Sequence, residues 1–203
     1  MIIRGQTRRN YNRLSKWYDL FAGSEKRITD IGIRMLDLQQ NESILEIGCG
    51  TGHALVEFSR KGGKVLAIDI SEKMLEVARR KIRNTNAGLC QADGLFVPFP
   101  NDSFDVVFIS FTLELFGPSE IPNLLKECCR VLKDDGRMGI VSLVKQETSA
   151  VRVYEWFHRR LPNLVDCRPI RLQPLLNEAG IHVLESTVKK IWELPVEIAM
   201  GRK

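Results

Sequence analysis

The stretch Ile44-Leu45-Glu46-Ile47-Gly48-Cys49-Gly50-Thr51-Gly52 joins a short apolar run to a glycine-rich loop. Residues 43–47 predict a β-strand, and residues 54–60 after the loop predict a helix. Glycines at such a junction permit a tight turn and let a ligand approach the backbone closely. A glycine loop by itself is equally compatible with a simple turn. In an open α/β sheet, however, ligands lie beyond the carboxyl ends of the strands, so we expect a ligand site here.

Short β-rich runs alternate with helical runs after this loop. Ser71 is a predicted N-cap, and apolar residues recur after it at helical spacing as far as Ile82. The run 104–110 is continuously apolar, as expected of a central strand buried on both faces. A turn is predicted at Asp134-Asp135-Gly136. The remaining predicted elements are strands at 64–68, 88–91 and 137–143, helices at 119–132 and 172–179, and a closing hairpin of 181–188 and 191–200.

This alternation predicts an α/β fold. We expect a Rossmann-like, seven-stranded, mostly parallel sheet with helices on both faces and a C-terminal antiparallel β-hairpin. The first 40 residues lie outside the alternation and read as helices punctuated by Gly5, Gly23 and Gly32.

Two carboxylates follow later strands. Asp69 ends the second strand, 17 residues after Gly52, where an acid can accept hydrogen bonds from two ribose hydroxyls. Asp93 follows the third strand, where a carboxylate can accept a hydrogen bond from an adenine amino group. Position 53 is His, so the loop reads GxGxG and lacks the third glycine that packs a helix closely under a pyrophosphate. A cofactor with an adenosine but no phosphates fits this pattern better than a dinucleotide.

Residues 40–145 resemble the class I S-adenosylmethionine (SAM)-dependent methyltransferases. The resemblance is carried in order by ILEIGCGTG, AIDIS, QADGLFVPFPNDSFDVVFIS and RVLKDDGRMGIVS. It implies SAM as the cofactor, S-adenosylhomocysteine as the product, and methyl transfer to a small-molecule acceptor. Glu46 and the loop 48–52 would hold the methionine portion, and Asp69 the ribose. The full set of SAM contacts implied is Tyr18, Glu46, Gly48, Cys49, Gly50, Gly52, Asp69, Ile70, Met74, Ala92, Asp93, Gly94, Ser110 and Phe111.

The other roles also follow from the resemblance. Ile70 and Met74 would enclose the adenine, and Asp93 with its neighbours would lie at the adenine edge. Ser110 and Phe111 would line the floor beside the sulfonium.

The N-terminal segment resembles the helical cap of small-molecule methyltransferases, particularly the ubiquinone/menaquinone biosynthesis group. The resemblance lies in Tyr18-Asp19 and implies that Tyr18 closes over the SAM carboxylate. We therefore expect a cap at 1–40, a SAM-binding domain at 41–203, and a substrate lid in the aromatic and basic segment 149–171. The residues after Tyr18-Asp19 depart from the quinone pattern, so the acceptor is open between a quinone precursor, a lipid and other apolar or anionic small molecules.

Methyl transfer is a direct displacement, so an enzyme must mainly align the nucleophile and exclude water. A general base is needed only if the nucleophile carries a proton with a high pKa. The sequence offers His158 and Glu114 as candidate bases and identifies no catalytic residue. Cys49 is interpreted as a small filler, and His53 as the start of a helix without a chemical role.

Two other function classes stay open, a SAM-binding protein without catalysis and an RNA methyltransferase. Residues 1–34 carry eight Lys or Arg against three acids, which suits RNA, an anionic lipid surface or only a solvated face. Strand four exits as Ser110-Phe111-Thr112-Leu113, without the aromatic-proline tetrad of amino-directed nucleic-acid methyltransferases. We therefore expect no DNA acceptor and disfavour RNA and a nicotinamide-dependent reaction, whereas peripheral membrane contact stays open.

Composition fits this interpretation. The 203 residues are 44% hydrophobic with a formal net charge of +5, which suits one domain with a small appendage. No run of about 18 apolar residues occurs, and the first residues lack the apolar centre of a signal peptide, so we expect a cytoplasmic protein. The five cysteines have neither CxxC spacing nor an even number, which predicts reduced thiols and no metal site.

Overall fold

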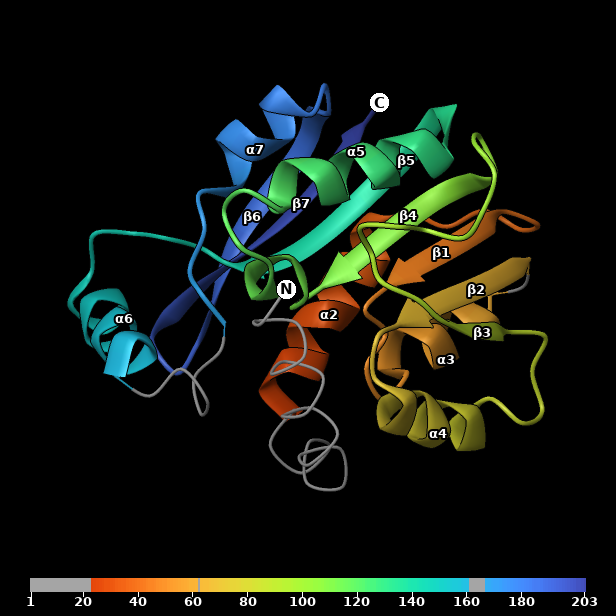
Figure 1. Cartoon of the computed structure of the whole chain (residues 1–203), viewed down its shortest axis with the longest axis horizontal. Helices are drawn as coiled ribbons and strands as arrows, with labels where there is room; N and C mark the ends of the chain where they lie inside the picture. Colours follow the sequence, from red (N-terminus) through yellow and green to blue (C-terminus); the bar gives the residue numbers. More distant parts are fainter. Residues whose placement is uncertain (1–22, 62, 161–166) are drawn as a thin grey trace.

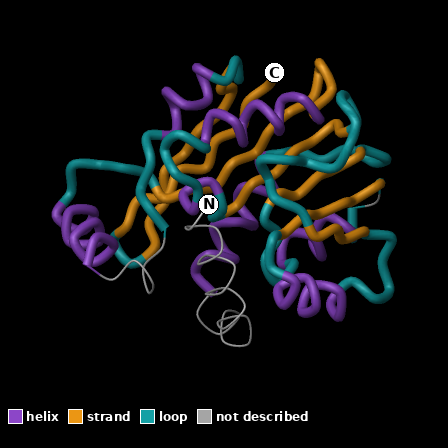
Figure 2. The backbone as a smooth tube through the Cα atoms, in the orientation of Figure 1, coloured by secondary structure: helices purple, strands orange, loops and turns teal. Residues whose placement is uncertain are grey.

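The computed structural model describes residues 23–61, 63–160 and 167–203. Strands form one central layer, and helices cover both of its faces (Figures 1 and 2). The strands are β1 (Ser43–Ile47), β2 (Lys64–Asp69), β3 (Gly88–Gln91), β4 (Phe104–Ser110), β5 (Leu132–Leu143), β6 (His182–Ile191) and β7 (Leu194–Arg202). The helices are α2 (Gly23–Met35), α3 (His53–Ser59), α4 (Glu72–Lys81), the 3-10 helix η1 (Leu113–Leu115), α5 (Ile121–Val131), α6 (Ser149–Arg160) and α7 (Leu172–Glu178).

The strand order is β3-β2-β1-β4-β5-β7-β6. Strands β1 to β5 pair in parallel, whereas β7 pairs antiparallel with both β5 and β6. The predicted seven-stranded, mostly parallel sheet with a C-terminal antiparallel hairpin is confirmed. Since the strand order reverses between β1 and β4, their carboxyl ends flank the switch point at which open α/β sheets bind ligands.

Strand β4 shows why the sheet is buried on both faces. Val107 and Ile109 pack into a core with α5 and α7, whereas Val106 and Phe108 pack into a second core with α2, α3 and α4. On that second face, the rings of Phe58 and Phe108 meet edge to face at 5.3 Å. The continuous apolar run predicted a strand with this two-sided environment.

Two predicted boundaries are wrong. Strand β5 begins at Leu132 and runs through the predicted turn at 134–136, because Leu132 already pairs with Phe104 and the ladder resumes at Arg137 opposite Val106. The residues between them bulge out of the ladder. The hairpin turn is Trp192-Glu193, with φ of 47° and 65°, rather than the predicted gap at 189–190. Such turns usually carry Asn or Gly, so Trp192-Glu193 has no turn signal in the sequence.

Helix α2 is the described part of the predicted N-terminal cap, and residues 1–22 lie outside the described ranges. Gly32 was expected to interrupt the helices, but it lies inside α2 and is buried. A Cβ at Gly32 would lie 2.7 Å from Val141 Cγ2 and 3.3 Å from the Phe108 ring. This glycine therefore allows close packing of α2 on the sheet rather than a break.

The C-terminal end of α2 is tied to the sheet by one arginine. The Arg137 guanidinium donates to the carbonyl oxygens of Leu36 (2.6 Å) and Asp37 (3.0 Å), and to both carboxylate oxygens of Glu42 (2.6 and 2.8 Å). Bidentate arginine–carboxylate contacts fix geometry well. Within the described residues, no helix is long and apolar enough to cross a membrane.

We predict that Gly32→Ala destabilises the fold although alanine favours helices. The helix propensity gain is about 1 kcal/mol, but overpacking against Val141 and Phe108 costs about 1–3 kcal/mol. Urea unfolding should therefore show a lower free energy of unfolding. Gly23→Ala is the matched control, because a Cβ at Gly23 meets no atom of the described residues within 4 Å. Equal stabilisation by both substitutions would contradict the close packing of α2.

Candidate functional site

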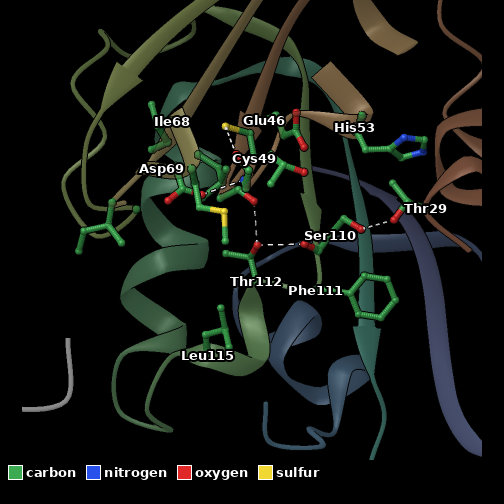
Figure 3. Close-up of a pocket in the computed structure, with 18 of the residues that line it drawn as sticks. Thr29, Glu46, Cys49, His53, Ile68, Asp69, Ser110, Phe111, Thr112 and Leu115 are labelled. Carbon is green, nitrogen blue, oxygen red and sulfur yellow. Dashed lines mark hydrogen bonds between the residues drawn. The ribbon is translucent and has the colours of Figure 1, made fainter. Parts of the chain in front are cut away.

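A pocket opens at the carboxyl ends of β1, β2 and β4 (Figure 3). In Figure 3, Ile68 and Asp69 lie on one side of it, and Thr29, His53 and Phe111 lie on the other. Most of the contacts predicted from the sequence line this pocket: Glu46, Gly48, Cys49, Gly50, Asp69, Ile70, Met74, Ala92, Asp93, Gly94, Ser110 and Phe111. Residues that follow several different strands therefore meet at the carboxyl edge of the sheet.

The glycine loop is bound to the end of β2 by its own backbone. The N–H groups of Gly48 and Cys49 donate to the carbonyl oxygen of Ile68 at 2.8 and 3.1 Å. The Gly50 N–H donates to Asp69 Oδ2 at 2.8 Å, and the Ser71 N–H donates to Asp69 Oδ1 at 2.8 Å. Asp69 thus shapes the loop as well as lining the pocket.

Gly48 is required by two separate constraints. Its φ is +72°, a region that residues with a Cβ rarely adopt. A Cβ at this position would also overlap with the side chain of Thr112. The hydroxyl of Thr112 lies 3.2 Å from the carbonyl oxygen of Gly48 and 2.9 Å from that of Ser110. The loop therefore packs directly on the residues that follow β4.

Glu46 is the most unusual polar residue of the site. Its side chain is only 3% exposed, and burial, together with the charge of Asp69, raises its pKa to about 8. Its Oε2 is the one buried side-chain oxygen or nitrogen, among the described residues, without a hydrogen-bond partner. A buried carboxylate with an unsatisfied oxygen is costly. A ligand that brings a donor or a cation would remove that cost.

The neighbouring side chains share this low-dielectric environment. Burial raises the pKa of Asp69, although the backbone N–H groups of Ser71 and Gly50 oppose the shift. Burial also raises the pKa of the Cys49 thiol, and the charges of Glu46 and Asp69 add to the effect. A thiol held neutral is a poor nucleophile, which agrees with the interpretation of Cys49 as a small filler.

The opposite side of the pocket is built by α2 and α3. Thr29 Oγ1 and Ser110 Oγ lie 2.7 Å apart, and His53 Nε2 lies 2.8 Å from Asp30 Oδ1. Phe111 follows β4 with a φ of 49°, which is rare for a bulky residue. Backbone strain of this kind often marks functional sites. Polar groups and one aromatic ring therefore line the side of the pocket opposite Asp69 (Figure 3).

Some predicted residues lie elsewhere. Gly52 is the N-cap of α3 and does not line the pocket; a Cβ there would lie 2.9 Å from Ala78 Cβ. Glu114 accepts from Ser142 Oγ at 2.9 Å and from the Leu143 N–H at 3.1 Å, so it joins η1 to β5. His158 lies on α6, which contributes no residue to the pocket lining. Tyr18 lies outside the described residues.

Glu114 is therefore not placed to act as a base. Its carboxyl group is buried, does not line the pocket and already accepts two hydrogen bonds. Burial raises its pKa to about 7. The substrate-lid role of 149–171 stays a prediction, since 161–166 are not described and α6 packs beside β7. No three His, Cys, Asp or Glu side chains of the described chain are grouped to hold a metal ion.

Several lining residues were not predicted from the sequence: Glu25, Lys26, Thr29, Ile47, His53, Ala54, Ile68, Thr112, Leu115, Phe116 and Glu120. Those of α2 are spaced as one helical face, at 25, 26 and 29. The spacing alone did not show which side of the sheet α2 covers. Thr112 and its neighbours follow β4 directly, so the carboxyl-edge rule could have found them.

The fold and this pocket define a Rossmann-like protein with a cavity at the switch point of its sheet. Residues 44–136 match the family described as "Methyltransferase domain". The chain is 29% identical over 185 residues to a demethylmenaquinone methyltransferase from Tropheryma whipplei, covering 83% of this chain and 75% of the relative. It is 34% identical over 144 residues to a ubiquinone/menaquinone biosynthesis C-methyltransferase from Pectobacterium carotovorum, covering 66% and 55%. Several curated relatives are therefore matched over little more than half of their length.

A solved structure shares the fold. It is a Burkholderia thailandensis 1,6-didemethyltoxoflavin N1-methyltransferase with bound 1,6-didemethyltoxoflavin and S-adenosylhomocysteine, at a TM-score of 0.76 and 16% identity over 98% of this chain and 88% of that one. These comparisons support a class I SAM-dependent methyltransferase that resembles the ubiquinone/menaquinone biosynthesis group.

We predict that Glu46→Gln stabilises the ligand-free protein at high pH. Between the ordinary pKa of 4.5 and about 8, the folded state holds a proton on Glu46 that the unfolded state has released. The contribution of Glu46 to stability therefore falls as pH rises through this window. Chemical unfolding at pH 5 and pH 9 should show the variant gaining on the wild type by about 1–3 kcal/mol at the higher pH.

Glu114 shifts stability in the same direction but is present in both proteins, so it cancels in the comparison. Glu72→Gln, an exposed carboxylate on α4, should give no such pH-dependent gain. A pH-independent difference between wild type and Glu46→Gln would show that Glu46 is not a strained buried acid.

Proposed function

We propose that this protein binds SAM in the pocket and transfers its methyl group to a small-molecule acceptor. The observation that carries the proposal is the unsatisfied, buried oxygen of Glu46 beside the carboxylate of Asp69. SAM carries an ammonium and a sulfonium, and it has no phosphate that two buried carboxylates would repel. These two acceptor groups thus fit SAM better than a nucleotide.

The division of the pocket supports an assignment of its parts. Asp69 would accept hydrogen bonds from the ribose hydroxyls, since a carboxylate oxygen that holds one backbone N–H keeps a free lone pair. Ile70 and the almost fully buried Met74 would enclose the adenine, with Asp93 and Gly94 at its edge. Glu46 and the glycine loop would hold the methionine portion.

The other side of the pocket would hold the acceptor. When bound, SAM supplies an electrophilic methyl group: the acceptor atom forms the new bond to carbon as the carbon–sulfur bond breaks and its electron pair goes to sulfur. The residues facing this side are Thr29, His53, Ser110 and Phe111. Their task is to orient the acceptor and exclude water.

His53 supplies a base for an acceptor that must lose a proton. Its Nε2 is 2.8 Å from Asp30 Oδ1, and a carboxylate on one ring nitrogen fixes the tautomer and leaves the other nitrogen to accept a proton. His53 takes this role in place of Glu114 and His158, which do not line the pocket. It was interpreted from the sequence as only the start of a helix.

The relatives and the pocket together support a proposal for the acceptor class. Two relatives are named for menaquinone or ubiquinone biosynthesis. A hydroxylated ring would stack near Phe111 and direct its hydroxyl to the polar groups of Thr29, Ser110 and His53. We therefore propose a hydroxylated aromatic acceptor of the quinone-precursor kind.

The SAM site is tested by Asp69→Ala. Loss of hydrogen bonds to a charged group should weaken S-adenosylhomocysteine binding by roughly 1–3 kcal/mol in titration calorimetry. Asp105→Ala is the matched control, because Asp105 also accepts from a backbone N–H, that of Ser43 at 2.8 Å, but at the far end of the sheet. The control should lose stability and keep its affinity. Absence of S-adenosylhomocysteine binding by the wild type would end the proposal.

The acceptor side is tested by His53→Gln and His53→Ala, with release of S-adenosylhomocysteine from SAM measured over a panel of reduced quinones, catechols and non-ionisable analogues. If His53 is the base, both variants should lower kcat by about 10²–10⁴ and leave S-adenosylhomocysteine affinity within about twofold. Glutamine restores a hydrogen bond to Asp30 but cannot take the proton. Full activity of His53→Gln would assign His53 to positioning alone.

A further inference from the structure

Apolar side chains are exposed on one part of the molecule, away from the pocket. Six of the seven large hydrophobic residues exposed in the described chain lie on α6, β6 or the turn between β6 and β7. The most prominent are Trp192 (74% exposed), Val153 (55%), Trp156 (47%) and Phe157 (43%). Clusters of exposed apolar residues of this kind mark interaction surfaces.

The aromatic residues of α6 and of the hairpin turn belong to one surface. A shallow groove is lined from both elements by Ala150, Val153, Phe157, Trp192 and Leu194. The rings of Trp156 and Phe157 meet edge to face at 5.0 Å. Figure 1 shows α6 beside the end of the hairpin. We call this surface, together with the cations described next, the aromatic–basic face.

Exposed cations surround the aromatic residues. Arg152, Arg159 and Arg160 lie on α6, and Lys189 and Lys190 lie just before the turn. The Arg160 guanidinium lies 5.1 Å from the centre of the Trp156 ring. Two acids nearby are already bound to lysines: Glu155 to Lys145 at 3.0 Å and Glu193 to Lys190 at 2.9 Å. The surface therefore carries a net positive charge beside its aromatic residues.

We propose that the aromatic–basic face docks this protein on an anionic lipid surface. Tryptophan and phenylalanine enter the boundary between headgroups and acyl chains, while arginine and lysine stay at the anionic headgroups. Each Lys or Arg near such a surface strengthens binding by about tenfold or less. A protein partner would bring acids and a complementary apolar ridge, whereas lipid needs only this combination of aromatic tips and cations.

The aromatic–basic face lies at the same edge of the sheet as the pocket. Strand β5 runs parallel to β4, so its carboxyl end lies at the same edge of the sheet as the pocket. Helix α6 follows that end, and the start of β7 is held beside it by pairing of Leu143 with Val196. Docking would therefore bring the pocket edge toward the lipid, which suits a lipid-dissolved acceptor. Only this consequence rests on the proposed function; the docking itself does not.

The test is sedimentation of the full chain with vesicles of phosphatidylcholine, with and without phosphatidylglycerol. We expect binding that requires the anionic lipid and weakens as salt is added. Trp156→Ser combined with Trp192→Ser, and separately Arg159→Glu combined with Arg160→Glu, should each lower the partition coefficient at least about tenfold. The tryptophan emission of the wild type should shift to shorter wavelength on the vesicles, and the Arg159→Glu, Arg160→Glu variant, which keeps all three tryptophans, should lose that shift.

Matched controls lie elsewhere on the surface. Phe96 is 74% exposed in the loop after β3, so Phe96→Ser removes an equally exposed apolar residue. Arg79→Glu with Arg80→Glu reverses two exposed cations on α4. Both controls should keep vesicle binding, and all variants should keep the thermal unfolding midpoint and the S-adenosylhomocysteine affinity of the wild type.

Several results would overturn the proposal. These are no binding to anionic vesicles, equal binding to both vesicle types, or equal losses in the control variants. A dimer in analytical ultracentrifugation that the double tryptophan variant dissociates would assign the face to a second copy of the chain instead.

Discussion

The buried carboxylate of Glu46, at the end of β1, is the constraint on which the site depends. Glu46 lies on a strand between β2 and β4, so water cannot reach it easily, and one of its oxygens has no partner among the described residues. Burial makes the charged form of this acid unfavourable. The loop that follows must therefore keep open a space in which a donor can meet that oxygen. The loop is held against the end of β2 by its hydrogen bonds to the Ile68 carbonyl oxygen and the Asp69 carboxylate.

The two sides of the pocket differ in how they are held. On the side of Asp69, strand ends and short backbone hydrogen bonds position its carboxylate, and their geometry follows from the parallel ladder. On the opposite side, Thr29 and Asp30 come from a helix that is separate from the ladder. That helix is kept in place by close packing at Gly32 and by the contacts of Arg137 with its C-terminal end. Changes in α2 can therefore alter one side of the pocket while the side of Asp69 stays intact, which allows one fold to take different ligands.

Much of the fold was readable from the chain. The alternation of strands and helices, the loop at 48–52 and the acids at 46, 69 and 93 repeat a local pattern, and the carboxyl-edge rule then brings them to one place. Errors arose where local signals conflict with long-range pairing. The Asp134-Asp135-Gly136 run has turn composition, yet the pairing of Leu132 with Phe104 draws it into β5 as a bulge. Trp192-Glu193 lacks turn composition and yet turns, because the register of β6 and β7 requires it.

The sequence by itself therefore determined the class of fold, the position of the ligand loop and the identity of most pocket acids, because these depend on patterns within a few residues of one another. The tertiary structure decided which residues line the side of the pocket opposite Asp69. His53 meets Asp30 across 23 positions of sequence, and Thr29 meets Ser110 across 81. The tertiary structure also makes Glu114 a packing residue rather than a candidate base, since only the folded chain brings Ser142 to its carboxylate. Contacts between distant segments have no local signature, so no reading of spacing could supply them.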